Sequence, residues 1–228
     1  MLFRQLFHQL SGTYTYLLGC EATHQAIIID PVAEVTPQYL TLLEQLGLKL
    51  AIAFDTHTHA DHITALGQLR DATGCKTVMG KYTAAECVSE KIDGGEIISV
   101  GDIEIKALYT PGHTNESFSF YIEGKVFTGD VLLIRGSGRT DFQGGDAGKS
   151  WDSIQNQLFT LPDSTLVYPA HDYKGWTVSS IAEEKSHNPR LSGKSREQYI
   201  DIMNNLKLPD PKMMDIAVPA NLRCGKLP

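Results

Sequence analysis

The sequence is poor in cysteine, in basic residues and in long apolar runs. Its four cysteines, Cys20, Cys75, Cys87 and Cys224, lie far apart without a CxxC pair, which argues against a disulfide scaffold and against a cysteine-based zinc site. The 20 Lys and Arg are outnumbered by 27 Asp and Glu, the net charge is −7, and no basic run occurs. Because affinity for phosphate comes first from Lys and Arg, we expect no nucleic-acid partner and no anionic membrane. No apolar run approaches the roughly 18 residues of a membrane helix.

What the chain does contain is the composition of an ordinary folded globule. Apolar residues make up 42% of the 228 residues and charged residues 21%. The N-terminal stretch lacks the apolar core and cleavage site of a signal peptide, so the expected compartment is the cytosol. Histidine is the residue type to follow, since several of the eight histidines gather in one short stretch.

Some segments of the chain have the apolar pattern of β-strands and others have the apolar spacing of helices, which together predict an α/β fold. The chain passes twice from strands to helices, which predicts two sheets inside and helices outside. The predicted strands are Thr13–Leu18, Ala26–Asp30, Leu48–Phe54, several between Glu96 and Thr128, and Thr165–Tyr168. The predicted helices begin at Thr36-Pro37, run from Ile63 to Gly74 and over Lys149–Leu161, and begin again near Ser180 and Ser195, whereas the tail from Pro209 has no clear period.

Three imidazoles and a carboxylate fall within six residues, directly after a predicted strand. They form the stretch HTHADH, with His57, His59, Asp61 and His62. In an extended segment alternate side chains share a face, so His57 and His59 can reach one site. Asp61 and His62 then turn towards a neighbouring site. A solvated polar loop is the alternative, but this cluster of ligand-type side chains predicts a metal site.

Three later residues stand at strand ends beside glycine or proline. They are His113 in PGHT, Asp130 in TGD and His171 in PAHD. Each alone is a weak signal, because a single histidine is more often a hydrogen-bonded structural residue. Their order after the HTHADH stretch makes them candidates for the same site.

The motifs HTHADH, PGHT, TGD and PAHDY, in this order, resemble those of the metallo-β-lactamase superfamily. This resemblance implies an αββα sandwich, two central mixed sheets flanked by helices, with a metal site at the loop-lined edge between the sheets. It also implies one domain over residues 1–228, in which the helices and tail from about residue 179 complete the substrate pocket. Hydrolases of this fold, including glyoxalase II, use all seven such side chains to hold two metals.

Four further segments are similar to those of persulfide dioxygenases, also called sulfur dioxygenases. They are Gly129–Gln143, Tyr168–Tyr173, Asn188–Arg190 and Ala217–Gly225. The resemblance implies one iron(II) per chain, held by His57, His113 and Asp130. Such a two-histidine, one-carboxylate set leaves three adjacent positions open on an octahedral metal, where sulfur and O₂ can bind side by side. Zinc has no redox chemistry and cannot replace iron in this role.

The same resemblance leaves four ligand-type residues in supporting roles. His59, Asp61, His62 and His171 are then expected to orient the ligand imidazoles and metal-bound water by hydrogen bonds. From spacing alone a second metal is not excluded, and a glyoxalase II-type hydrolase of glutathione thioesters with two metals stays the alternative. The chain ends 57 residues after His171, which is short for the extra helical domain of such hydrolases.

The implied reaction oxidises glutathione persulfide with O₂ and water to sulfite and glutathione, in sulfide catabolism and detoxification. Because the substrate carries carboxylates and the chain is acidic, local cations are needed. We expect Arg139, Tyr173 and Arg223 to line the glutathione pocket, with Arg190 either joining them or bracing the fold. Structural ion pairs are the alternative for each arginine.

Several properties stay open at the level of sequence. Members of the family often form homodimers, and a rhodanese or a sulfide:quinone oxidoreductase is a compatible supplier of persulfide. The start of the chain close to the first predicted strand fits a bacterial cytoplasmic enzyme or a processed mitochondrial form. We expect Cys224 to be buried and inert. His8, His24 and His187 receive no role.

Overall fold

The structure is a computed structural model that describes residues 1–209 and 213–227. The chain divides into two units, which are described separately. The first unit comprises Met1–Ile92, Ile97–Ile105 and Asp210–Pro228, and the second comprises Asp93–Glu96 and Lys106–Pro209.

The first unit contains a six-stranded mixed sheet in the order β1-β2-β3-β4-β5-β6. β1, β2 and β3 pair antiparallel, whereas β3, β4, β5 and β6 pair parallel. In the parallel part Ile29 of β3 lies opposite Phe54 of β4, so the residues that follow these two strands leave the sheet at the same edge. The strands are β1 (Leu2–His8), β2 (Thr13–Gly19), β3 (Gln25–Ile29), β4 (Lys49–Phe54), β5 (Lys76–Gly80) and β6 (Glu90–Ile92).

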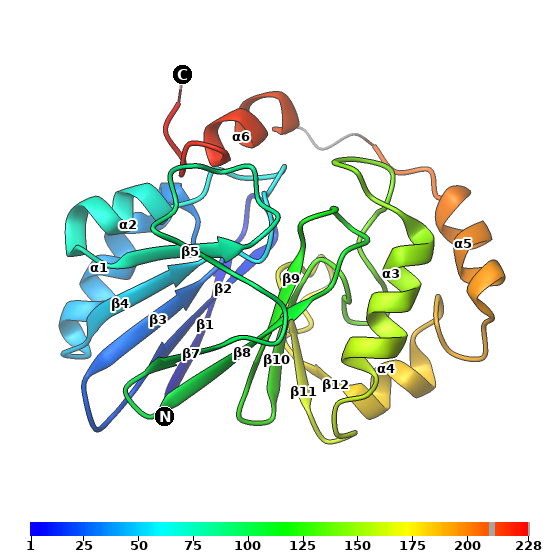
Figure 1. The fold of residues 1–228 in the computed structure, drawn as a ribbon, viewed down its shortest axis with the longest axis horizontal. Coiled ribbons are helices and arrows are strands. Elements are labelled where there is room, and N and C mark those ends of the chain that lie inside the picture. Colours follow the sequence, from blue (N-terminus) through cyan, green and yellow to red (C-terminus); the bar gives the residue numbers. More distant parts are fainter. Residues whose placement is uncertain (210–212, 228) are drawn as a thin grey trace. The chain divides into compact units, whose positions relative to one another are not determined.

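Helices α1 (Thr36–Gln45) and α2 (Leu66–Thr73) cover this sheet (Figure 1). Pro37 starts α1 because its missing N–H is not needed there, and Gly74 ends α2 in the left-handed conformation, at φ 72°. The predicted start of α1 and end of α2 are confirmed, whereas α2 begins at Leu66 and not at Ile63. Their apolar faces join the sheet in a core that includes Leu17, Ile28, Tyr39, Leu43, Ala53, Leu66 and Leu69.

Four strands or α-helices of the first unit were not predicted: β1, β5, β6 and α6. β1 precedes the expected first strand, its sequence LFRQLFH places apolar and polar residues in pairs and not in alternation, and Phe7 within it is half exposed. Helix α6 (Met214–Asn221) lies in the tail that lacked a period, and it carries Pro219 inside. None of the helices in the described part of the chain has the length and apolarity that crossing a bilayer requires.

The other sheet is also mixed and runs in the order β12-β11-β10-β9-β8-β7. β10 and β11 pair parallel, with Gly129 opposite Pro169, so Asp130 and Ala170-His171 leave these strands at one edge. The strands are β7 (Ile97–Val100), β8 (Ile103–Tyr109), β9 (Phe118–Ile122), β10 (Lys125–Gly129), β11 (Leu166–Pro169) and β12 (Ser179–Ser180). β7 and the first three residues of β8 are counted with the first unit.

Helices of the second unit pack on strands of this sheet (Figure 1). They are α3 (Ala147–Ser153), continued by a π-helical turn (Ile154–Leu158), α4 (Ile181–His187) and α5 (Arg196–Asn204). The Ser180 hydroxyl caps α4, and Ser195 with Gln198 forms a full capping box on α5, which confirms both predicted starts. The shared core includes Val126, Val131, Leu132, Ile154, Val167, Ile181 and Tyr199.

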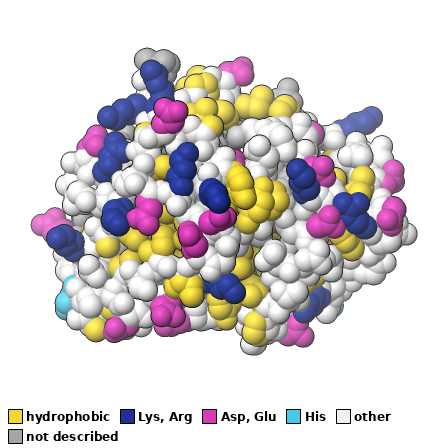
Figure 2. Space-filling model, viewed as in Figure 1, with side chains coloured by type: hydrophobic (Ala, Val, Ile, Leu, Met, Phe, Trp, Pro, Cys, Tyr) yellow, Lys and Arg dark blue, Asp and Glu magenta, His cyan; other side chains and the backbone are white. Residues whose placement is uncertain are grey.

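Charge on the surface agrees with the acidic composition. On the face shown in Figure 2, Lys and Arg side chains are interspersed with Asp and Glu and form no continuous basic patch.

Candidate metal centre

The histidine-rich loop of the first unit follows β4 and is buried. His57, His59 and His62 are each at most 4% exposed. Their rings follow one another, with centroids 4.2 Å apart for His57 and His59 and 4.3 Å apart for His59 and His62. Burying three imidazoles together costs solvation, which is offset only by partners or by a metal.

Asp30 supplies several of those partners from the end of β3. Its backbone is left-handed, at φ 52°, and its carboxylate accepts hydrogen bonds from the Thr56 amide at 2.7 Å and the Thr56 hydroxyl at 3.0 Å. The same carboxylate lies 3.1 Å from Nε2 of His59. The Thr56 hydroxyl proton is given to Asp30, so its oxygen accepts from Nδ1 of His57 at 3.0 Å. This assigns Nε2 of His57 as the nitrogen that can bind a metal.

Burial and neighbouring carboxylates act in opposite directions on the pKa of His59. Burial lowers the pKa of its imidazole, but the neighbouring Asp30, Asp55 and Asp61 carboxylates outweigh burial and raise the pKa from 6.5 to about 9. The acids around this ring therefore favour a positive charge, either a proton or a cation.

Two groups of side chains in the first unit have metal-binding geometry. One combines His59, Asp61 and His62, and the other combines His59 with Asp30 and Asp55; in each, one ligand atom from every residue lies within 4.8 Å of the others. The second group was not predicted, because Asp30 is remote in the sequence and meets the loop only through the pairing of β3 with β4.

The C-terminal segment fixes the loop from outside. The Asn221 amide donates to the carbonyl oxygens of His59 at 2.8 Å and His62 at 2.9 Å, and its oxygen accepts from the Thr64 amide at 2.9 Å. Buried and at 2% exposure, Asn221 thus replaces water for three backbone groups.

Cys224 is not the inert thiol that was expected. It forms a disulfide with Cys87, which attaches the residues after α6 to the segment between β5 and β6. The sequence separation of 137 gave no signal for this pair. Cys20 and Cys75 are buried thiols.

The second unit brings together His113, Asp130 and His171. Nδ1 of His171 donates to Oδ1 of Asp130 at 2.6 Å. Nδ1 of His113 donates to the Arg139 carbonyl oxygen at 2.7 Å, which assigns Nε2 as its metal-binding nitrogen. That Nε2 lies 3.7 Å from Oδ2 of Asp130. One imidazole nitrogen and one carboxylate oxygen therefore face each other at a separation that a shared cation can bridge.

Gly138 allows this arrangement. Its amide donates to the carbonyl oxygen of Asp130 at 2.7 Å. A Cβ at this position would stand 2.1 Å from that oxygen and 2.9 Å from Nδ1 of His113. Only glycine fits between the two candidate ligands.

A buried polar network supports the same loop. The Glu184 carboxylate, 0% exposed, accepts from the Arg135 guanidinium and from the Asn188 amide, which also donates to the Gly136 carbonyl oxygen at 2.9 Å. The Arg190 guanidinium donates to the Ser137 carbonyl oxygen. The network holds residues 135–138 in place; Arg135, Glu184 and Asn188 were not predicted as site residues.

The chain is similar to known proteins over almost its whole length. Residues 9–171 match the family described as Metallo-beta-lactamase superfamily. The human mitochondrial persulfide dioxygenase ETHE1 is 46% identical over 228 residues, covering 99% of this chain and 89% of the human protein. The chain belongs to the persulfide dioxygenase family. A crystal structure of ETHE1 from Myxococcus xanthus is 55% identical at a TM-score of 0.98, covering 99% of this chain and 100% of that one.

A hydrolase relative matches less closely. A probable hydroxyacylglutathione hydrolase of Schizosaccharomyces pombe is 37% identical over 180 residues, covering 76% of this chain and 68% of that protein. The predicted family and the metallo-β-lactamase fold, with two mixed sheets and flanking helices, are confirmed.

The ligand set that membership of the persulfide dioxygenases implies is divided between the units. His57 belongs to the first unit, and His113 and Asp130 belong to the second. Within the first unit His57 lies with His59, Asp61 and His62; within the second, His171 holds Asp130.

The four residues expected at the glutathione pocket differ in their surroundings. Arg139 forms a two-point ion pair with Asp141, at 2.7 and 2.8 Å, and lowers the pKa of that carboxyl. Arg190 is partly buried, which lowers the pKa of its guanidinium. Tyr173 is 75% exposed and its ring stacks on His171, with centroids 6.0 Å apart. Arg223 is exposed, and in the described part of the chain its guanidinium has no hydrogen bond or ion pair.

Proposed function

We propose that the protein oxidises glutathione persulfide with O₂ and water to glutathione and sulfite, using one iron(II) held by His57, His113 and Asp130. The near-complete coverage by the human protein named persulfide dioxygenase ETHE1, at 46% identity, and by the structure of ETHE1 from Myxococcus xanthus, at 55% identity, carries the proposal. The 3.7 Å approach of Nε2 of His113 to Oδ2 of Asp130 supports it, as does the donor set of two imidazoles and a carboxylate.

The residues present fit such an ion. Nδ1 is hydrogen-bonded in both proposed histidine ligands, to Thr56 in His57 and to the Arg139 carbonyl in His113, so both present Nε2. His171 takes Oδ1 of Asp130 and leaves Oδ2 for the metal. When bound, iron(II) would supply the one-electron redox chemistry that activates O₂, which no side chain of this site supplies.

The other ligand-type residues then have supporting roles, which are to orient the proposed ligands and to add negative charge near them. The acidic surroundings of His59, from Asp30 and Asp55, add negative charge beside the proposed ligand His57. Asp61 and His62 pair with each other at 2.9 Å. In this proposal Thr56 and the Arg139 carbonyl fix the tautomers of His57 and His113, His171 orients Asp130, and His59, Asp61 and His62 are supporting residues beside His57.

Arg223 is the first candidate for a substrate carboxylate. It is exposed and its guanidinium is not committed to another residue of the described chain, whereas Arg139 is already paired with Asp141. Arg139 and Tyr173 would join it at the pocket rim. We assign Arg190 the second of its two predicted roles, bracing the fold, because its guanidinium donates to the Ser137 carbonyl oxygen.

A two-metal glutathione thioesterase is the alternative, favoured by the His59, Asp61 and His62 group and by the fission yeast relative. One experiment separates the two. Protein purified without oxygen should contain about one iron per chain and should consume O₂ with glutathione persulfide but not with glutathione. Two zinc ions per chain and hydrolysis of lactoylglutathione without O₂ uptake would reject the dioxygenase.

We further propose that both units act as one domain, with the residues from about 179 completing the pocket, in a cytoplasmic homodimer. The single domain follows from the proposed ligand set, which draws on residues of both units. The family resemblance supports the dimer and a rhodanese or sulfide:quinone oxidoreductase as persulfide supplier. The relatives from animals are named mitochondrial, so fractionation of the native cells tests the compartment.

A further inference from the structure

His8, which received no role from the sequence, stands at the outer end of a continuous row of proton-carrying groups. β1 and β2 form a hairpin in which His8 is paired directly opposite Thr13. Directly opposite residues of an antiparallel pair place their side chains on one face. The turn between them adds Ser11, so three hydrogen-bonding side chains line up along this face.

The distances define a connected chain. Nδ1 of His8 lies 2.7 Å from the Ser11 hydroxyl, which lies 2.6 Å from the Thr13 hydroxyl. The Thr13 oxygen lies 3.3 Å from both Oδ2 of Asp61 and Nδ1 of His62. Every member can both accept and donate a proton, which is the requirement for passing one along the chain.

The inner end of the row reaches the histidine-rich loop. His62 is followed by His59 and then by His57, the proposed iron ligand, at ring separations of 4.3 and 4.2 Å. Thr13 is 0% exposed, so water does not replace it from outside.

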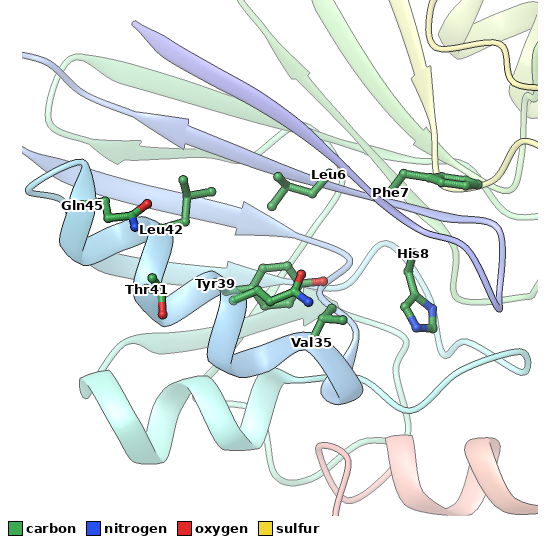
Figure 3. A pocket seen from close by; sticks show the side chains of 9 residues that line it. Leu6, Phe7, His8, Val35, Tyr39, Thr41, Leu42 and Gln45 are labelled. Carbon is green, nitrogen blue, oxygen red and sulfur yellow. The ribbon is translucent and has the colours of Figure 1, made fainter.

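The outer end reaches solvent. Nε2 of His8 lies 3.2 Å from the Glu34 carboxylate, whose side chain is 63% exposed. His8 also lines one end of a groove of about 340 Å³, together with Leu6, Val35, Tyr39 and Leu42 (Figure 3). A proton taken at Nδ1 of His8 can therefore leave from Nε2.

We propose that Thr13, Ser11 and His8 form a proton exit from the active site. The inference rests on the proposed function, whose stoichiometry demands such an exit. Persulfide, O₂ and water give thiol, sulfite dianion and two protons; the outer sulfur loses four electrons and O₂ gains them. A proton passes from the Asp61 and His62 pair to the Thr13 hydroxyl, then to Ser11, then to His8 and Glu34 or water.

The test uses the iron-loaded full chain and measures kcat, KM for glutathione persulfide and iron content. His8→Gln keeps hydrogen-bonding groups but cannot relay a proton, and Ser11→Ala interrupts the row. Both should lower kcat about tenfold with KM and iron unchanged; the loss is smaller than the ~10²-fold of a direct general acid or base because water offers slower routes. Ser11→Thr restores the hydroxyl and should restore kcat.

Rescue separates proton transfer from a structural role. In His8→Ala, added imidazole fits the groove and should recover most of kcat, whereas it should not raise the rate of wild type or of His24→Asn, an exposed histidine outside the row. The relay is wrong if His8→Gln and Ser11→Ala keep kcat within twofold of wild type, if their iron falls with kcat, or if imidazole restores nothing. Absence of O₂ uptake by the wild type rejects the proposed function itself, and the relay with it.

Discussion

The first unit presents its candidate metal-binding side chains from one loop, whereas the second collects them from three strand ends. His57, His59 and His62 follow each other along six residues and are held by Asp30 and Asn221. His113, Asp130 and His171 come from separate segments and contact each other directly or through the loop of Gly138. The arrangement in the first unit depends on hydrogen bonds from other side chains, Asp30 and Asn221. The arrangement in the second unit depends on the close approach of the Gly138 backbone to the Asp130 carbonyl.

The two units should therefore be sensitive to different kinds of substitution. In the first unit a ligand is positioned through side chains that a substitution can remove one at a time. In the second unit the carbonyl oxygens of Asp130 and Arg139 are part of the site, so a small steric change moves both proposed ligands. The following predictions test this contrast.

Removing a proposed ligand should have the largest effect. His57→Ala in the first unit and His113→Ala or Asp130→Ala in the second should each abolish iron binding and O₂ uptake, a loss above ~10³-fold. His171→Ala removes only a hydrogen bond to Asp130 and should weaken iron binding by about 10- to 100-fold. Metal analysis with O₂-electrode traces measures both, and a full complement of iron in Asp130→Ala would contradict the ligand assignment.

Adding one methyl group to the second unit should come next. Gly138→Ala places a Cβ 2.1 Å from the Asp130 carbonyl oxygen, so the pair of His113 and Asp130 must separate. We expect iron affinity to fall about 100-fold, or ~2.7 kcal/mol. Gly136→Ala is the matched control, because its Cβ would have only Leu133 at 3.9 Å and should change nothing. Equal behaviour of the two variants in iron titrations would remove the steric argument.

The contrast between the units also decides what the sequence alone could predict. The His57 to His62 loop was recognisable because its members are neighbours in sequence. Asp130 and His171 meet because β10 and β11 run parallel, with Gly129 opposite Pro169, and no local pattern encodes that pairing. Their role was predicted only through the family resemblance.

Asp30 and Asn221 were not predicted as site residues because they are also remote from the loop in sequence. Asp30 reaches the loop through the pairing of Ile29 with Phe54, and Asn221 reaches it through helix α6, whose Pro219 hides the helical pattern. Local signals with a direct physical cause, such as Pro37, Gly74 and the Ser195 capping box, gave helix ends that the structure confirms.

Removing Asn221, which holds the histidine-rich loop of the first unit, should have a smaller effect than Gly138→Ala in the second unit. Asn221→Ala deletes three hydrogen bonds to the backbone of the loop and leaves buried carbonyl groups, so we expect the free energy of unfolding to fall by about 2 kcal/mol. Thermal and urea unfolding measure it. Asn205→Ala, on an exposed helix end, should stay within about 0.5 kcal/mol of wild type. A loss no larger than that of the control would show that the loop does not depend on Asn221.

The smallest effect is expected at the substrate arginines, one from each unit. Arg223 of the first unit has no acid partner in the described chain, whereas Arg139 of the second is paired with Asp141 and donates to the Pro209 carbonyl oxygen at 2.7 Å. If Arg223 binds a glutathione carboxylate, Arg223→Ala should raise KM about tenfold, or ~1.4 kcal/mol, with kcat and iron kept. Arg223→Lys should recover part of this, since a lysine keeps the charge but loses the two-point geometry.

Arg139→Ala should raise KM less, because its guanidinium is already engaged by Asp141. A larger KM increase for Arg139→Ala than for Arg223→Ala would show that the ion pair with Asp141 opens when substrate binds, and would place the main carboxylate contact in the second unit.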